Sequence, residues 1–314
     1  MKLHLLVLTG VLAATSHGLF AADTEFTAAS DEGRLVITAG NQPVATFVFR
    51  DEKILRPYFA QVYAPGGVQV TRKHPPEKGV DAIDHDMMHP GLWLAFGDIS
   101  GADFWRNKER VQHVEFIERP AAKGSVVRFA ARYRYLAGEK IVCREVARYT
   151  VRAVEPGYLF TLDSEFSGDE PFAFGDQEEM GLGVRLATPL TVKQGSGSIT
   201  SSEGGRNESE VWGRQADWCE YSGTISGRRT GILVMPHPDN FRRSWMHVRD
   251  YGLVVANPFG QRAFTKGEAS RIEVKPGEKL RLRFGVLAYA TDDPSGFDPG
   301  KVRDSYVRMA TANK

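Results

Sequence analysis

The chain contains little cysteine, almost no excess charge and no long apolar segment. Its 314 residues include two cysteines, and 40 Lys and Arg residues against 39 Asp and Glu residues give a formal net charge of +1. This balance gives no electrostatic reason to expect nucleic acid or an anionic membrane surface as a partner. No segment supplies the roughly 20 consecutive apolar residues of a membrane-spanning helix, so no membrane span is expected.

Several catalytic signatures are also missing. The sequence has no G-x-S-x-G nucleophile elbow, no phosphate-binding loop and no dinucleotide-binding glycine fingerprint, which sets aside serine hydrolases, kinases and nicotinamide enzymes. Cys143 and Cys219 lie in very different sequence contexts, so two buried free thiols are the simpler interpretation and a disulfide is the alternative.

The histidines leave a metal site open as an alternative. In HDMMH, His85 and His89 are four residues apart, and His113, His247 or a carboxylate could supply further ligands. The stretch lacks the full H-E-x-x-H pattern and a strong helical context. The sequence therefore predicts no cofactor, and histidines acting as acids or bases are the preferred interpretation.

The N-terminal segment has the pattern of a secretory signal peptide. Lys2 precedes an apolar run over residues 5–14, and the small residues Ala21 and Ala22 close the segment. We expect residues 1–22 to be removed, residues 23–314 to form a single domain, and the mature protein to be periplasmic or secreted.

Alternating apolar and polar residues dominate the remaining chain. Long alternating segments such as VVRFAARYRYL, VCREVARYTVRA and GYLFTLDSEFSG are separated by short turns that contain Gly or Pro. A helical period is convincing only in DPGKVRDSYVRMATA, near the C-terminus. The predicted fold is therefore all-β, an antiparallel sandwich of two sheets with a short C-terminal helix.

Side-chain parity predicts a functional face on two strands. In EEMGLGVRL, one face is apolar and the other carries Glu179, two glycines and Arg185. The glycines would either leave a flat floor for a ligand or accommodate a bulky neighbour, with Glu179 paired to Arg185 on the surface. In HPGLWLAFG, His89 and Trp93 share a face with small residues, while Leu92, Leu94 and Phe96 face the core.

Other segments supply more rings and charges. GDISGADFW carries Asp98, Asp103 and Trp105, and EVWGRQADWCEYSG carries Trp212 and Asp217. In NFRRSWMHVRDYG, parity places Arg243, Trp245, His247 and Arg249 on one face. Aromatic rings beside carboxylates suit a sugar, whose C–H groups lie on rings while its hydroxyls bond to charged groups.

These segments define a set of candidate site residues. The acid–base roles are assigned to His89, His113, Glu179 and His247. Substrate binding is assigned to Trp93, Asp98, Asp103, Trp105, Arg185, Trp212, Asp217 and Arg249. Glu178 is left out because adjacent residues of a strand face opposite ways, so the partner of Glu179 would be Asp98, Asp103 or Asp217.

Three long motifs carry a family resemblance. DHDMMHPGLWLAFGDISGADFWRNK, DQEEMGLGVRL and VWGRQADWCEYSG resemble a bacterial family of exported proteins often labelled methane oxygenase PmoA, over a span from about Arg56 to Phe259. This chain has Asp86, Met87 and Met88 where many members carry a richer histidine run, which weakens the case for a metal. The strands are also similar in style to the mutarotase-like β-supersandwich of carbohydrate-active enzymes, an analogy at the level of fold.

The sequence therefore predicts an exported protein that acts on a carbohydrate, either a small sugar or an oligosaccharide. The preferred function is an enzyme that cleaves or isomerises a glycoside. The alternatives are a carbohydrate-binding module without catalysis and a metal-dependent oxidoreductase, as the family label suggests.

Overall fold

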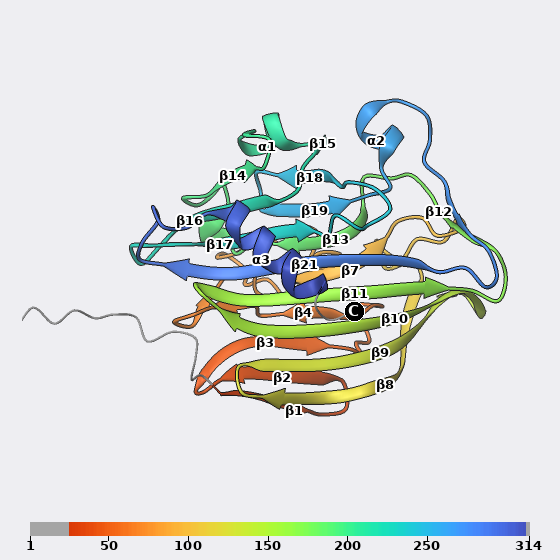
Figure 1. The fold of residues 1–314 in the computed structure, drawn as a ribbon, viewed down its shortest axis with the longest axis horizontal. Coiled ribbons are helices and arrows are strands. Elements are labelled where there is room, and N and C mark those ends of the chain that lie inside the picture. Colours follow the sequence, from red (N-terminus) through yellow and green to blue (C-terminus); the bar gives the residue numbers. More distant parts are fainter. Residues whose placement is uncertain (1–24, 312–314) are drawn as a thin grey trace, which may run out of the picture.

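The computed structural model describes residues 25–311, in which two large antiparallel sheets pack face to face (Figure 1). The expected signal peptide, residues 1–22, lies outside the described residues. The first sheet has nine strands in the order β1 (Phe26–Ser30), β2 (Arg34–Ala39), β3 (Gln42–Val48), β4 (Tyr58–Ala60), β7 (Leu92–Phe96), β13 (Met180–Arg185), β19 (Leu253–Asn257), β18 (Trp245–Arg249) and β15 (Arg214–Gln215).

The second sheet has eight strands, most of them longer. Their order is β14 (Ser198–Ser201), β16 (Cys219–Ile225), β17 (Arg228–Pro236), β21 (Leu280–Thr291), β11 (Gly157–Ser167), β10 (Lys140–Val154), β9 (Val126–Ala137) and β8 (Arg110–Lys123). Two small pairs complete the strands, β5 (Tyr63–Ala64) with β6 (Val68–Gln69) and β12 (Phe172–Phe174) with β20 (Ile272–Val274).

The predicted alternation is confirmed where the two sheets meet. Met180, Leu182 and Val184 of β13 enter the main core, as do Leu92, Leu94 and Phe96 of β7. Because side chains alternate along a strand, the residues between them are directed to the opposite, outer face of the first sheet. Cys143 and Cys219 are buried free thiols.

The predicted C-terminal helix is also confirmed. It is α3 (Pro299–Thr311), and it crosses the outer face of the second sheet, where the Tyr306 ring packs against Gly285 of β21. Short helical turns occur at Thr188–Leu190, α1 (Asn207–Val211) and α2 (Gln261–Thr265). Within the described part of the chain, no helix has the length and apolar character needed to cross a membrane.

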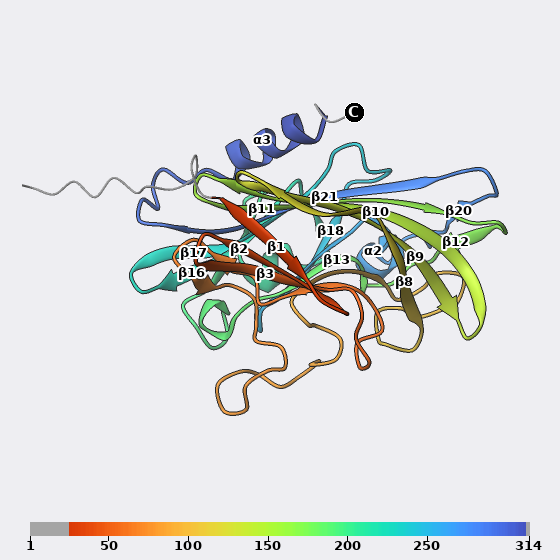
Figure 2. The same cartoon turned by 90° about the horizontal axis from the view of Figure 1, so that it is seen from below.

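Irregular segments cover the outer face of the first sheet. Figure 2 shows the orange loops that precede β7 on the side of the sandwich opposite α3. Beneath them lies a second apolar layer, formed by Val48, Ile54, Tyr58, Ala60, Trp93, Ala95, Trp105, Leu253 and Val255. The loops therefore bury this outer face of the first sheet, and most of the predicted site residues lie on it.

Candidate functional site

Strand register brings the candidate residues onto this outer face. Trp93 of β7 is paired with Gly183, Gly183 with Val255, and Val255 with His247 of β18. In the next row, Arg185 is paired with Leu253, and Leu253 with Arg249. At about 4.8 Å per strand, Trp93 and His247 lie about 14 Å apart. The candidate residues therefore form two groups, one at β7 and one at β18.

Stacked rings form the end at β7. The His89 ring lies between those of His85 and Trp93, at centroid distances of 4.9 and 5.2 Å and nearly parallel to both. Trp105 meets Trp93 edge-on at 5.3 Å, and Tyr251 lies parallel to His85 at 6.1 Å. With Arg185, these residues are called the His89 cluster below. His89 is 1% exposed, because His85 covers it.

The glycines of β13 are not an open floor. A Cβ atom on Gly183 would lie 2.6 Å from the Trp93 ring and 3.0 Å from the Trp105 ring. Gly181 has a φ of +110°, and a Cβ there would lie 2.1 Å from the Ala256 carbonyl oxygen. The alternative interpretation therefore holds for Gly183, since the absent side chain makes room for two indoles.

The carboxylates differ from the sequence expectation. Glu178 and Glu179 lie in a bend before β13, where strand parity does not apply. Glu179 forms an ion pair with Arg106 instead of Arg185. Glu178 lies 3.4 Å from His247 Nδ1 and 3.3 Å from Arg249 Nη2. Burial raises the pKa of Glu179, and the Arg106 charge opposes that effect.

Arg185 is a fully buried cation with free donors. Its Nη2 donates to Asp84 Oδ1 at 2.9 Å, and its guanidinium lies over the Tyr251 ring at 4.4 Å. Its Nε and Nη1 atoms have no hydrogen-bond partner. A buried guanidinium with unused donors is costly unless another group satisfies it.

Two further buried arginines hold the segment that covers the cluster. Arg72 donates to the carbonyl groups of Ala82, Asp84, His85 and His89, and Arg56 donates to those of Met88 and Trp105. These bonds satisfy backbone acceptors that an irregular segment cannot pair by itself. They also hold His85, whose φ is +51°, over the His89 ring.

Buried polar atoms without partners are concentrated here. Among the described residues, the buried atoms of the His89 cluster that lack a hydrogen bond are His89 Nδ1 and Nε2, Trp93 Nε1, Trp105 Nε1, and Arg185 Nε and Nη1. Trp212 Nε1 and His247 Nδ1, toward the other end of the row, are also without one. Buried polar atoms are nearly always paired in folded proteins, so this concentration indicates a place for water or a ligand.

The end at β18 combines rings with charges. The Arg249 guanidinium lies over the Trp212 ring at 5.5 Å, and Arg249 Nη1 donates to Glu208 at 2.8 Å. Burial and the nearby Arg249 charge lower the pKa of His247 to about 3, so its imidazole is neutral at ordinary pH. Burial and the surrounding cations likewise hold the pKa of His89 well below its usual value.

Some predicted site residues lie elsewhere. His113 belongs to β8 of the second sheet and packs among Phe49, Phe116 and Tyr133, where burial lowers its pKa to about 4. Asp217 is at the surface and accepts from Arg243 Nε at 2.7 Å. The structure therefore does not bring either residue to the His89 cluster.

Two aspartates organise the loop after β7. Asp98 accepts from the Gly101 N–H at 2.8 Å. Asp103 accepts from the N–H groups of Trp105 and Arg106, at 3.1 and 3.0 Å, and so fixes the turn that presents both side chains. These bonds favour a positioning role for both carboxylates.

Several residues of the site were not predicted from the sequence. They are Arg56, Arg72, Arg106 and Tyr251, while His85 was considered only as a metal ligand and Glu178 was set aside on strand parity. Most come from loops and bends, in which no periodic signal tells which face a side chain will reach. No group of three or more His, Cys, Asp or Glu side chains that could hold a metal ion occurs among residues 25–311.

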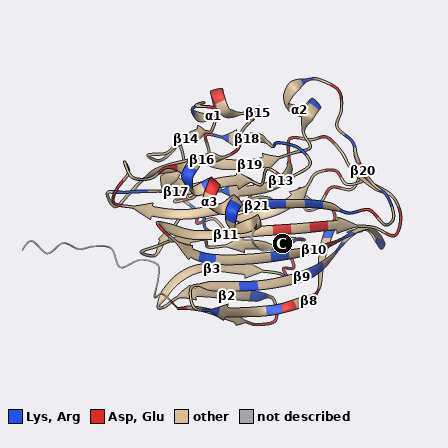
Figure 3. Ribbon diagram, viewed as in Figure 1, with Lys and Arg blue, Asp and Glu red and all other residues tan. Residues whose placement is uncertain are grey.

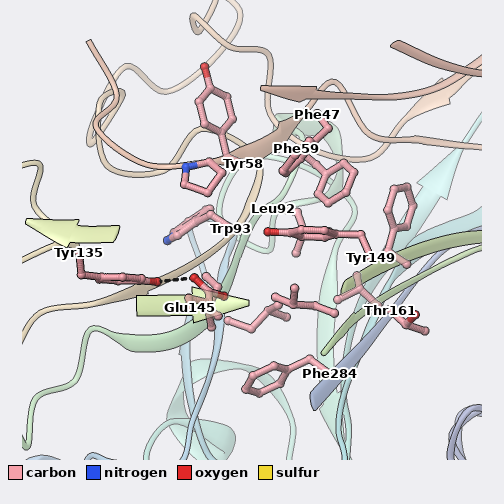
Figure 4. Close-up of a pocket in the computed structure, with 16 residues that line it drawn as sticks. Phe47, Tyr58, Phe59, Leu92, Trp93, Tyr135, Glu145, Tyr149, Thr161 and Phe284 are labelled. Atoms are coloured by element: carbon pink, nitrogen blue, oxygen red, sulfur yellow. Dashed lines mark hydrogen bonds between the residues drawn. The ribbon is translucent and has the colours of Figure 1, made fainter. Parts of the chain in front are cut away.

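Two hollows adjoin the first sheet on opposite sides. One, of about 520 Å³, lies on the outer face beside the covering segment, with Tyr58, His74, Asp86 and Met87 among its lining residues. The other, of about 30 Å³, lies between the sheets and has room for only one or two waters (Figure 4). Glu145 lines it and accepts from Tyr135 at 2.9 Å and from Ser164 at 2.5 Å, while burial raises its pKa to about 7.

Residues 34–295 match the model of DUF6807, a family of unknown function. The chain belongs to this family. The family has no functional name, so the methane oxygenase label gains no support from the match. No curated protein matches the chain.

Several solved structures that are similar to this chain are named for sugars. A galactose mutarotase related enzyme from Lactobacillus acidophilus is 9% identical, with a TM-score of 0.42 and coverage of 85% of this chain and 98% of that one. A galactose mutarotase-like protein from Clostridium acetobutylicum is 10% identical, with a TM-score of 0.42 and coverage of 86% and 99%. An alpha-galactosidase from Lactobacillus brevis is 7% identical, with a TM-score of 0.42, and this chain covers 40% of its length, with 86% of this chain aligned. At these identities and scores, the likenesses assign no chemistry to this chain.

Proposed function

We propose that the outer face of the first sheet binds a saccharide at the His89 cluster and transfers a proton to or from it. The observation that carries the proposal is the set of buried, unpartnered polar atoms beside two indoles. A ligand that satisfied those atoms would have to be rich in hydrogen-bonding groups and flat enough to lie among rings. A pyranose meets both requirements.

The donors and acceptors of the cluster match hydroxyl groups. Trp93, Trp105 and Arg185 offer N–H donors only. His89 is neutral, because burial and nearby cations lower its pKa, so one ring nitrogen donates and the other accepts. A sugar hydroxyl both donates and accepts, and it can therefore bond to either kind of group.

Glu179 is the proposed proton donor. Burial raises its pKa, which increases the fraction of the carboxyl that holds a proton near neutral pH. Glu178, held near Arg249 and His247, is the second carboxylate of the site. Two carboxyl groups in different surroundings are the usual requirement for cleaving a glycosidic bond, and one of them is enough for isomerisation.

The proposed ligand reaches the site past His85. Its ring covers His89, and the hollow of about 520 Å³ opens next to the segment that carries it. A sugar would displace the His85 ring and stack in its place. The arginine contacts of the segment would hold its backbone while the side chain moves.

The test begins with a screen of oligosaccharides and aryl glycosides against the full chain. On any substrate found, Glu179→Gln should lower the rate by roughly a hundredfold to ten-thousandfold, because an amide cannot transfer the proton. The free energy of unfolding should change by less than about 1 kcal/mol. Glu165→Gln is the matched control, since Glu165 pairs with Lys279 on the second sheet. Full activity of Glu179→Gln would contradict the role, and binding without turnover in the wild type would favour a binding module.

We also propose that the protein is exported. The basic start, short apolar run and small-residue close of residues 1–22 support a signal peptide. Mass spectrometry of the protein from its native host should give a mature chain that starts near residue 23. An intact Met1 would contradict export by this route.

A further inference from the structure

A second polar hollow lies on the opposite side of the sandwich, between the second sheet and α3. Its volume is about 250 Å³, and its arginine side chains come from β9, β10 and β21, while α3 contributes Tyr306, Met309 and Ala310. Figure 3 shows Lys and Arg positions recurring along the strands of this face. Since α3 and the loops over the His89 cluster lie on opposite faces, this hollow is separate from the site described above.

Strand register brings three arginines around one point. Arg148 and Arg152 flank Thr150 on β10, and Arg128 of β9 is paired with Thr150. Side chains two residues apart on a strand share a face, and diagonal neighbours across two strands lie about 7–8 Å apart. The flanking residues Phe129 and Val151 are buried in the core, which confirms that the arginines face outward.

These three arginines lack partners, whereas the others at the hollow have them. Arg281 binds both oxygens of Asp163, and Arg283 binds Asp239. Asp163 is paired in register with Arg148, but its carboxylate forms hydrogen bonds with Arg281 instead. Among the described residues, no ion pair or side-chain hydrogen bond joins Arg128, Arg148 or Arg152 to any group.

The three guanidinium groups repel one another in the free protein, although Arg128 and Arg148 are exposed to solvent. Like charges at this spacing repel, and among the described residues the carboxylates that line the hollow are Glu118 and Asp163. Burial and the neighbouring Arg128 charge lower the pKa of Arg152. The effect of Arg128 reflects the repulsion between these two guanidinium groups. A bound anion would remove this cost.

We propose that the hollow binds a phosphate or sulfate group carried by a small molecule. Three guanidinium groups offer more donors than the two oxygens of a carboxylate accept, and they suit an oxyanion with three or four oxygens. The volume is below the range typical of drug-sized ligands, which favours a small one. Leu159 and Met309 give the hollow an apolar wall next to the cations.

The test titrates the full chain with sodium phosphate and sodium sulfate, using sodium chloride at matched ionic strength as reference. Binding is measured by calorimetry and by the shift in melting temperature. Saturable binding of either oxyanion is expected, and Arg148→Gln with Arg152→Gln should weaken it about tenfold or more, as expected for lost charge-assisted bonds. Arg134→Gln is the control, because Arg134 lies on β9 outside the hollow.

The pH dependence separates the two anions. Affinity for phosphate should rise as pH passes its second ionisation, because the dianion carries more charge, while affinity for sulfate should not change there. Stabilisation by chloride equal to that by phosphate and sulfate would show screening alone and would overturn the proposal. Equal affinities of the wild type and the double variant would also overturn it, since they would place any bound anion elsewhere.

Discussion

The carboxyl of Glu145 is buried and that of Glu179 is partly buried, and burial raises the pKa of both, yet their surroundings differ. Glu145 lies in the core between the sheets, and neighbouring hydroxyl groups satisfy both of its oxygens. Glu179 precedes β13 beside Arg106, and the charge of His85 in the His89 cluster also acts on it, while the polar atoms of His89, Trp93 and Arg185 in that cluster have no partners. A perturbed pKa alone therefore does not locate a functional site. Unsatisfied neighbours distinguish a carboxyl poised for a ligand from one that belongs to the core.

The largest expected effect concerns Glu145 and pH. Its folded-state pKa is about 7 against a usual value of 4.5, so the folded state binds more protons between these values. Its contribution to stability is therefore fully present below about pH 4.5 and is lost as pH rises through about 7, a change of about 3 kcal/mol. Urea denaturation of the wild type and Glu145→Gln at several pH values isolates this change.

Glu145 and Glu179 should also differ in their effect on turnover. Glu145→Gln should keep the turnover of any substrate found and lose the pH dependence just described. The histidines with lowered pKa values act in the opposite direction in acid, and they are common to both proteins, so the difference between the two proteins removes them. A Glu145→Gln variant with the same pH dependence as the wild type would show that Glu145 does not titrate with a raised pKa.

A smaller effect is expected at the floor of the His89 cluster. Gly183→Ala should lower the free energy of unfolding by about 1–3 kcal/mol, because the new Cβ would overlap the Trp93 and Trp105 rings. The control is Gly267→Ala, where the nearest atom is the Thr265 hydroxyl oxygen at 3.1 Å. Equal stabilities of the two variants would contradict the packing of the indoles over β13.

The smallest effect is expected at Asp217. Asp217→Asn removes a surface ion pair with Arg243 and should change the stability by less than about 1 kcal/mol. Turnover should not change, since Asp217 lies away from the His89 cluster. A large loss of turnover in steady-state kinetics would return Asp217 to the substrate-binding set.

The parts of the fold and site that follow from the sequence are those with a periodic, local pattern. Alternation in β7 and β13 predicted which residues enter the core and which face outward, and it placed His89, Trp93 and Arg185 together. It failed at Glu178, because a bend before β13 brings adjacent carboxylates to one face.

Tertiary placement was the other source of error. The alternation of β8 gives His113 a buried position, but no pattern within the strand tells which sheet it joins. Arg56, Arg72 and Tyr251 reach the cluster from loops, and their positions depend on contacts between distant segments. The sequence therefore predicts which face of each strand is buried in the core, but it does not predict which loops cover the outer face of the first sheet.

A ligand that binds at the His89 cluster should be detected directly by its tryptophans. The most direct measurement is a titration of the full chain with the saccharide identified by the screen, followed through the indole N–H resonances of its five tryptophans. Trp93 and Trp105 have buried N–H groups without partners, so their resonances should shift saturably as hydrogen bonds to the sugar form. Trp218 packs against the opposite sheet, and its resonance should stay in place. Saturable binding that leaves the Trp93 and Trp105 resonances unmoved would contradict ligand binding at the His89 cluster.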